Sequence, residues 1–146
     1  MWNVNTKNKC LWSTSAKIEV YFSEFGNVFI SFSGGKESAL LLQLVIDYKK
    51  RNNLSTKIGV FNQDFESQYQ VTTEFVEEIF EKYISDIEPY WVCLPMDLRT
   101  SLSNYQLYWY LWDDKNKDIW IGNFPDKPYV IHIENNPFYL YKYRML

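Results

Sequence analysis

Cysteine, histidine and excess basic charge are scarce or missing in this sequence. The 146 residues include two cysteines, Cys10 and Cys93, and a single histidine, His132. Two distant cysteines exclude a disulfide framework and a zinc ribbon, and they favour a reducing, cytoplasmic location. Fifteen basic residues against eighteen acidic ones give a net charge of −3. Proteins that coat nucleic acid normally have a basic excess, so the charge does not indicate nucleic-acid binding, although a local basic patch stays open.

Long hydrophobic runs are missing as well. The longest apolar run, residues 39–46, is interrupted by Gln43 and is far shorter than the roughly 20 residues that span a bilayer. The first five residues lack the apolar core of a signal peptide. We therefore expect a soluble cytoplasmic protein with no membrane contact.

Apolar and aromatic residues, by contrast, are plentiful. Hydrophobic residues make up 47% of the chain and aromatic residues 19%. The length allows one domain, which we expect to span residues 1–146. It divides into a leading helix at 13–25, a strand–helix core at 28–95 and an aromatic-rich C-terminal part at 96–146.

The core region alternates strand and helix patterns. Strands are expected at 28–32, 57–61 and 90–94, and the first helix at 37–50. Ser67 and Gln70 have the spacing of a capping box and predict the start of the second helix, while Pro89 predicts a break before the third strand. This alternation is typical of a parallel sheet with right-handed crossovers, and hence of the α/β class.

The flanks are less regular. Residues 15–25 fit an amphipathic helix, and part of them also fits a strand; the helix is preferred because Gly26 and Asn27 form a good helix stop. After Pro95 a polar loop leads to residues 104–112 and a charged turn at 113–118. Two short strands are expected at 119–121 and 129–133.

One motif indicates a binding function. It is Ser33-Gly34-Gly35-Lys36-Glu37-Ser38, which lies between the first expected strand and the first core helix. Glycines let the backbone approach an oxyanion, and the unpaired N–H groups of the first helical turn point at such a ligand. Ile30 and Glu37 exclude a Walker A loop, and the absence of a third glycine excludes a dinucleotide fingerprint.

The motif resembles the pyrophosphate loop of the N-type ATP pyrophosphatases, whose usual form is Ser-Gly-Gly-x-Asp-Ser. With the segment from Phe61 to Glu66, it is most similar to the phosphoadenosine phosphosulfate reductase branch. Further matching residues are Tyr69, Thr72, Phe75, Val76, Cys93, Leu94, Pro95, Tyr108 and Trp109. The resemblance covers about residues 25–138. It implies a Rossmann-like three-layer sandwich with a mainly parallel sheet, as in the adenine nucleotide alpha hydrolase-like superfamily.

The resemblance also implies a site for ATP or a related adenine nucleotide, with Mg²⁺. Lys36 and Asp64 would be catalytic, and Asp64 and Glu66 would hold the metal; from the residues alone, these acids fit a solvated loop equally well. Cys93 fits a small buried hydrophobe better than a nucleophile. The nucleotide-binding residues implied are Ser31, Ser33, Gly34, Gly35, Lys36, Glu37, Ser38 and Phe61.

Three departures from the family pattern bear on activity. Glu37 stands where the family usually has Asp. The C-terminal Glu-Cys-Gly segment of true reductases is absent, so sulfonucleotide reduction is not expected. Relatives of the nearest branch usually continue beyond the position of Leu146, so we expect this chain to be a short form.

Two functions therefore follow as expectations. The chain is an enzyme of the ATP pyrophosphatase and adenylyl-transferase type, which cleaves ATP between the α- and β-phosphates and adenylates an acceptor. Alternatively, it is a non-catalytic nucleotide-binding module that regulates with a partner, since members of the nearest branch are encoded with a ParB-like protein. Exposed aromatic side chains would then serve that partner or a homodimer.

Overall fold

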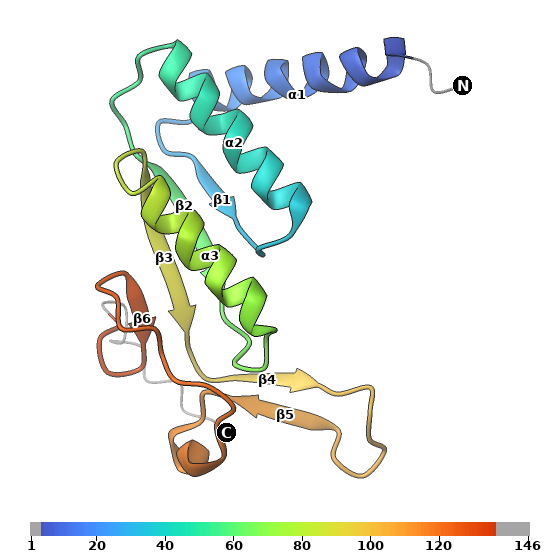
Figure 1. The fold of residues 1–146 in the computed structure, drawn as a ribbon, viewed down its shortest axis with the longest axis vertical. Coiled ribbons are helices and arrows are strands. Elements are labelled where there is room, and N and C mark those ends of the chain that lie inside the picture. Colours follow the sequence, from blue (N-terminus) through green and yellow to red (C-terminus); the bar gives the residue numbers. More distant parts are fainter. Residues whose placement is uncertain (1–3, 137–146) are drawn as a thin grey trace.

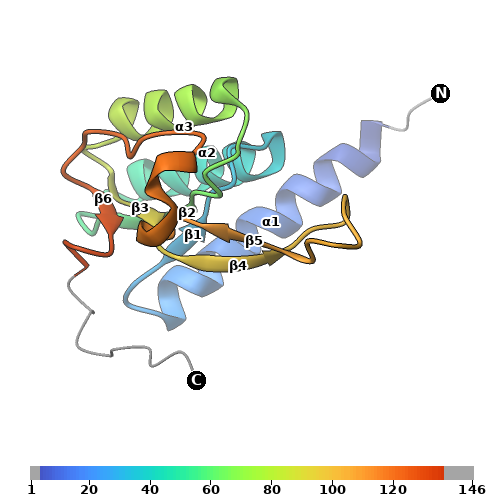
Figure 2. The same cartoon turned by 90° about the horizontal axis from the view of Figure 1, so that it is seen from below.

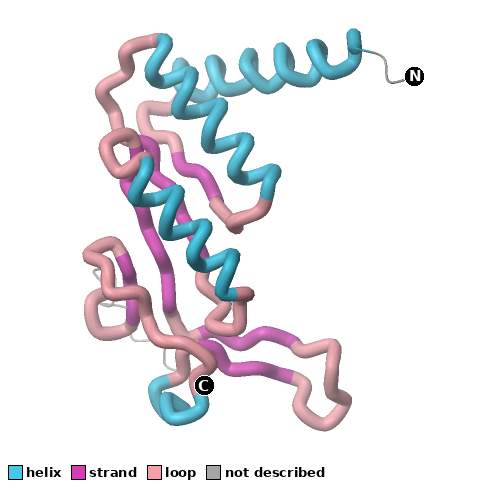
Figure 3. The backbone as a smooth tube through the Cα atoms, viewed as in Figure 1, coloured by secondary structure: helices cyan, strands magenta, loops and turns pink. Residues whose placement is uncertain are grey.

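The computed structural model describes residues 4–136, and Figure 1 shows their arrangement. The helices are α1 (Val4–Glu24), α2 (Lys36–Arg51), α3 (Gln70–Lys82) and the short 3-10 helix η1 (Asp114–Ile119). The strands are β1 (Phe29–Ser31), β2 (Ile58–Gln63), β3 (Ile87–Cys93), β4 (Met96–Arg99), β5 (Tyr108–Leu111) and β6 (Val130–His132). Figure 3 separates these elements from the connecting loops by colour.

The main sheet has four parallel strands in the order β1-β2-β3-β6. The strands at 28–32, 57–61 and 90–94 and the helix at 37–50 are confirmed to within a few residues, and so is the α/β class with a parallel sheet. β4 and β5 pair separately as an antiparallel hairpin that extends away from the sheet at the end where the main strands finish (Figure 1).

The hydrophobic core lies between the sheet and two helices. Seen from below in Figure 2, α2 and α3 lie on the same side of the strands, as expected when successive right-handed crossovers run in one direction. Phe80 of α3 is fully buried, with its ring centroid 5.9 Å from those of both Phe32 and Trp91. The buried core residues are Ile18, Ile30, Phe32, Leu42, Val45, Ile46, Ile58, Val60, Val76, Phe80, Ile87, Trp91, Cys93, Leu111, Trp112 and Val130.

The opposite face of the sheet is open in the part of the chain that the structure describes. Phe29 is 65% exposed and Phe61 38% exposed, and the Phe29 ring lies 6.1 Å from that of Tyr90. Gly59 sits beneath the Phe29 ring, where a Cβ would collide with it. Within residues 4–136, α2 and α3 thus cover one face of the sheet. A three-layer sandwich also needs helices on the other face, so it stays a prediction.

Helix α1 confirms the expected leading helix and begins earlier than residue 13, at Val4. It crosses the end of the molecule where the main strands begin (Figure 1). Phe22 stacks on Tyr48 of α2 with ring centroids 5.2 Å apart, and Ile18 joins the core. α1 therefore packs against α2 at the end of the sheet away from the loop at 33–38.

Three sequence expectations are wrong. The capping box does not form, because Tyr69 is the N-cap of α3, the Ser67 hydroxyl donates to the Phe65 carbonyl and the Gln70 amide donates to Glu74. Pro89 does not precede the third strand but lies inside β3, opposite Val60. β6 pairs only with the last three residues of β3, so the missing N–H of Pro89 breaks no ladder hydrogen bond there.

The third error concerns residues 119–121. Ile119 ends η1, and residues 120–121 follow it without forming a strand: the Ile121 N–H donates to the Glu66 carboxylate and the Trp120 indole N–H to the Asp113 carbonyl. The strand expected at 129–133 is confirmed as β6. Among residues 4–136, no helix combines the length and the apolar character needed to cross a bilayer. The end of the aromatic-rich part, residues 137–146, lies outside the described residues.

Candidate functional site

The candidate site lies at the carboxyl edge of the parallel sheet. The segment after β2 and the start of the β4–β5 hairpin lie at this edge, at the lower end of the sheet in Figure 1. The loop after β1, the shorter strand, lies higher in that view, beside the N-terminal part of α3. Ligands of open α/β sheets bind at this edge, because loops and helix N-termini converge there.

Gly34 shapes the loop between β1 and α2. Its φ of +73° lies in the left-handed region, and a Cβ on it would come within 2.8 Å of the Thr72 Cγ2 atom and 3.1 Å of the Val76 Cγ2 atom. The turn therefore presses against the first turns of α3, and a side chain there would be both strained and crowded.

The N-terminus of α2 follows directly from this turn. Gly35 is its N-cap residue and makes no side-chain capping hydrogen bond, so the first N–H groups of the helix have no side-chain acceptor. The Ser38 hydroxyl donates to the Gly35 carbonyl at 2.9 Å and lies 3.3 Å from the Ser33 hydroxyl. The two hydroxyls thus face one another across the turn.

The charged residues of the loop point into solvent. The Lys36 and Glu37 side chains are 91% and 81% exposed, and the Lys36 Nζ atom lies 3.8 Å from a Glu37 carboxylate oxygen. An exposed pair of this kind contributes little to stability. Lys36 is therefore free to turn toward an anion at the helix N-terminus.

Ser31 and Phe61 lie next to each other but on the other face of the sheet. They are partners in the β1–β2 register, and both alternate with residues that face α2 and α3. The structure therefore separates the predicted nucleotide-binding residues into the loop at 33–38 and a strand pair on the open face.

Asp64 follows β2 and is buried, with 5% of its surface exposed. One carboxylate oxygen accepts the Trp91 indole N–H at 2.8 Å, and the other accepts the Glu66 backbone N–H at 2.7 Å. Its backbone carbonyl accepts the indole N–H of Trp112 at 3.0 Å. Asp64 thus ties the end of β2 to β3 and to the segment after β5.

Glu66 is buried in a similar way, at 7% exposure, with a left-handed φ of +57°. Its carboxylate accepts the Trp112 N–H at 2.9 Å and the Ile121 N–H at 3.0 Å. Both donors belong to the C-terminal part, so Glu66 anchors that part to the main sheet. We call Asp64, Glu66, Trp91 and Trp112 the carboxylate–tryptophan cluster.

This cluster does not fit a metal site. All four carboxylate oxygens already accept an N–H donor, and less than a tenth of either residue is exposed. Within residues 4–136, no group of three or more His, Cys, Asp and Glu side chains could hold a metal ion. The geometry thus favours a structural role for Asp64 and Glu66 over metal binding. The Mg²⁺ site stays a prediction.

Two further residues belong to this edge and were not singled out from the sequence as site residues. Asn62 is 1% exposed, lies beside Trp91 in the β2–β3 register, and has a buried amide nitrogen with no partner in the described structure. Trp112 closes the carboxylate–tryptophan cluster. A polar residue in a buried strand was a usable signal for Asn62, whereas nothing local distinguishes Trp112 from the other tryptophans.

Cys93 ends β3 and is fully buried. Burial, assisted by the nearby Asp64 carboxylate, raises the pKa of its thiol far above the usual value. A thiol in that state is a poor nucleophile, so the expected role as a small buried hydrophobe fits the structure.

Comparison with known proteins yields one curated relative. The chain is 40% identical over 87 residues to "Uncharacterized protein YbdN" of Escherichia coli (strain K12). The match covers 59% of this chain but only 21% of the relative, so the chain spans about a fifth of the length of the protein that it matches. No protein-family model matches the chain, and no solved structure matches it significantly.

Proposed function

We propose that this chain binds ATP or a related adenine nucleotide with the phosphates seated in the loop at 33–38. One observation carries the proposal: at the carboxyl edge of a parallel sheet, the Gly34 turn leads into a helix N-terminus without a side-chain cap. Such a terminus offers several N–H donors and the positive end of the helix dipole to an anion.

The remaining loop residues suit the same ligand. The Ser33 and Ser38 hydroxyls can donate to phosphate oxygens, and Lys36 adds a charge that no buried partner holds in place. The buried amide of Asn62 is a further donor at this edge without an acceptor. The resemblance to the phosphoadenosine phosphosulfate reductase family, within the Rossmann-like adenine nucleotide alpha hydrolase superfamily, points to adenine as the base.

The activity that we propose is cleavage of ATP between the α- and β-phosphates. A nucleophilic acceptor attacks the α-phosphorus, the bond from that phosphorus to the bridging oxygen breaks, and pyrophosphate leaves with the electron pair. The loop N–H groups and Lys36 would stabilise the charge that gathers on the leaving pyrophosphate. No step is assigned to the carboxylate–tryptophan cluster, because its carboxylates are engaged within the protein.

The second candidate is a nucleotide-binding module without catalysis, acting with a protein partner of the ParB-like kind. It is favoured by the hydrogen bonds that engage both carboxylates of Asp64 and Glu66 within the protein, and by the absence, among residues 4–136, of a group of three or more His, Cys, Asp and Glu side chains that could hold a metal. The two candidates share the loop and differ only in whether bound ATP is cleaved.

Calorimetric titration with ATP, ADP and AMP tests the binding. We expect Lys36→Ala to weaken ATP about 10- to 100-fold, the effect of losing one charge-assisted hydrogen bond. Lys17→Ala is the matched control, because Lys17 is an exposed lysine on α1, at the other end of the sheet. Equal ATP affinity of the Lys36 and Lys17 variants contradicts the proposed site.

Assay of pyrophosphate and AMP then separates the two candidates. Release that requires Lys36 and Ser38 supports cleavage, whereas binding without release, with or without cell extract as a source of acceptor, supports the module.

A further inference from the structure

The β4–β5 hairpin has an outer edge, along β4, that no other strand covers within residues 4–136. A two-stranded hairpin is only marginally stable in water and gains stability when a further strand pairs with it. Figure 2 shows β4 on the side of the hairpin that faces away from α2 and α3. The edge of β4 is therefore a place where a strand from another chain can be added.

The free backbone groups of this edge belong to Asp97 and Arg99. The Thr100 N–H donates to the Leu107 carbonyl across the hairpin, and successive residues of an antiparallel strand bond to alternate sides. Thr100 and Leu98 hence bond toward β5, whereas the N–H and C=O groups of Asp97 and Arg99 point outward. In the part of the chain that the structure describes, no hydrogen bond occupies these outward groups.

The two outward residues carry opposite charges. Asp97 and Arg99 lie on the same face of the hairpin, and both are exposed. When two copies of β4 meet antiparallel about a two-fold axis at Leu98, Asp97 of each copy lies opposite Arg99 of the other. Opposite charges in facing positions stabilise antiparallel strands, whereas like charges repel. The edge is therefore complementary to itself in this one register.

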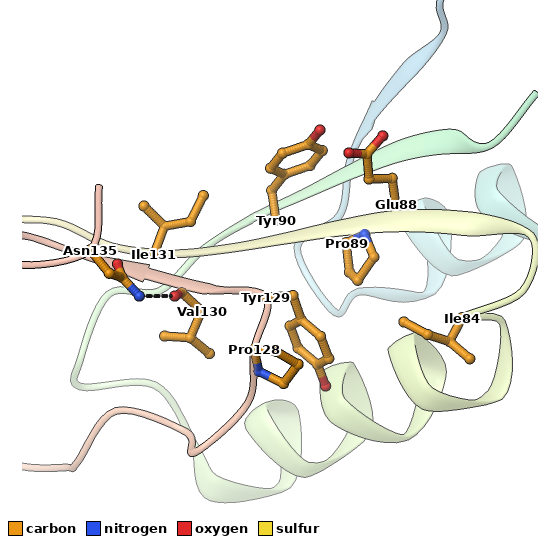
Figure 4. A pocket seen from close by; sticks show the side chains of 9 residues that line it. All are labelled: Ile84, Glu88, Pro89, Tyr90, Pro128, Tyr129, Val130, Ile131 and Asn135. Carbon is orange, nitrogen blue, oxygen red and sulfur yellow. Dashed lines mark hydrogen bonds between the residues drawn. The ribbon is translucent and has the colours of Figure 1, made fainter. Parts of the chain in front are cut away.

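The other strand edges of the described chain suit a second copy less well. Pro89 lies in the half of β3 that β6 leaves unpaired, beside a recess of about 460 Å³ (Figure 4), and it has no N–H to donate. The Asn135 amide donates to the Val130 carbonyl on the outer side of β6, and the Gln106 amide donates to the Tyr108 carbonyl on the outer side of β5. β1 has three residues and no charged side chain that would fix a register.

We propose that β4 pairs antiparallel with β4 of a second copy of this chain, so that the two hairpins form one continuous antiparallel sheet. Asp97 and Arg99 of each copy then face Arg99 and Asp97 of the other, and Leu98 faces Leu98 on the opposite side of the sheet. Residues 100–110 of the hairpin include no charged residue, so they add no charge repulsion between the two copies.

Charge exchange tests this pairing, with dimerisation measured by sedimentation equilibrium in the absence of nucleotide. Asp97→Arg sets two guanidinium groups opposite each other in both charged pairs, and Arg99→Asp sets two carboxylates there. We expect each variant alone to dimerise about 10- to 100-fold more weakly than the unaltered chain. An equal mixture of the two variants should recover dimerisation, because positions 97 and 99 then carry opposite charges between the chains. Glu19→Arg, at an exposed acid of α1, is the matched control and should change nothing.

Thiol crosslinking tests the register. In a Cys10→Ser background, where the remaining native thiol is the buried Cys93, Leu98→Cys should give a disulfide between copies on mild oxidation. Residues that face each other in a non-hydrogen-bonded pair have Cα atoms about 4.5 Å apart, which is within disulfide reach. Leu102→Cys, which is exposed in the hairpin loop away from the axis, should give none.

Four results would overturn the proposal. The unaltered chain could stay monomeric at millimolar concentration, or the single charge variants could dimerise as tightly as it does. A mixture of the two variants that does not recover dimerisation would contradict the charge pairing and also show that the single variants fail for another reason. Crosslinking at position 102 equal to that at position 98 would contradict the two-fold axis at Leu98.

Discussion

The carboxylate–tryptophan cluster makes a sharp prediction about Glu66. Glu66→Gln keeps the length of the side chain and an acceptor oxygen for one of the two N–H donors. The new amide group turns its own N–H toward the other donor, Trp112 or Ile121, which then stays buried without an acceptor. The variant therefore loses one hydrogen bond to a charged acceptor and gains a buried clash of donors.

The expected magnitude follows from those two changes. A hydrogen bond to a charged group contributes about 1.5–3 kcal/mol, and an unsatisfied buried donor costs about 1–3 kcal/mol. The two costs overlap because they concern the same N–H group, so we expect the free energy of unfolding to fall by about 2–4 kcal/mol. For a chain of this size that corresponds to a fall of roughly 6–12 °C in the midpoint of thermal unfolding. Circular dichroism in urea and on heating measures both quantities.

The control is Glu78→Gln, which removes one exposed charge from α3 without touching a buried donor. It should change stability by no more than about 0.5 kcal/mol, as most surface substitutions do. The metal hypothesis predicts the opposite sign for Glu66→Gln. Two carboxylates kept apart for a cation repel in its absence, so neutralising one would leave stability unchanged or raise it. Such a result would refute the structural role that we assign to Glu66.

Three other outcomes are expected. Gly34→Ala should lower both the unfolding midpoint and the ATP affinity, because its φ is left-handed and a Cβ would meet Thr72 at 2.8 Å; an unchanged affinity in calorimetry would contradict the loop site. A hydrogen bond from Lys49, together with Lys50, holds the pKa of Asp86 in the folded protein below its ordinary value of 3.8. The ionised Asp86 therefore stabilises the fold above pH 3.8, and this contribution is lost as the pH falls through the lowered pKa of the folded protein. Urea titrations at several acidic pH values should show a smaller loss on acidification in Lys49→Met, and equal losses would contradict the pair. Phe80→Ala should cost about 3–5 kcal/mol in the same assay, because Phe80 is fully buried at the centre of the core; a cost below about 1 kcal/mol would contradict that packing.

Much of the fold could be predicted from local pattern. The apolar periodicity of α2, the β-rich runs of β1 and β2 and the glycines at 34 and 35 all depend on neighbouring residues, which is why the strand–helix alternation and the loop were recognisable. The start of α3 and the position of Pro89 within β3 could not be predicted from local pattern. Whether Ser67 caps a helix depends on the carbonyl that competes for its hydroxyl, and whether a strand tolerates proline depends on how far the next strand extends.

The roles of Asp64 and Glu66 could be decided only by tertiary structure. Their carboxylates look alike in the sequence whether they serve a metal, solvent or the protein itself. The donors that occupy them lie far along the chain: Trp91 is 27 residues from Asp64, and Trp112 and Ile121 are 46 and 55 residues from Glu66. A local pattern carries no information about partners at such separations, because the folding of the whole chain determines which donors reach a buried carboxylate.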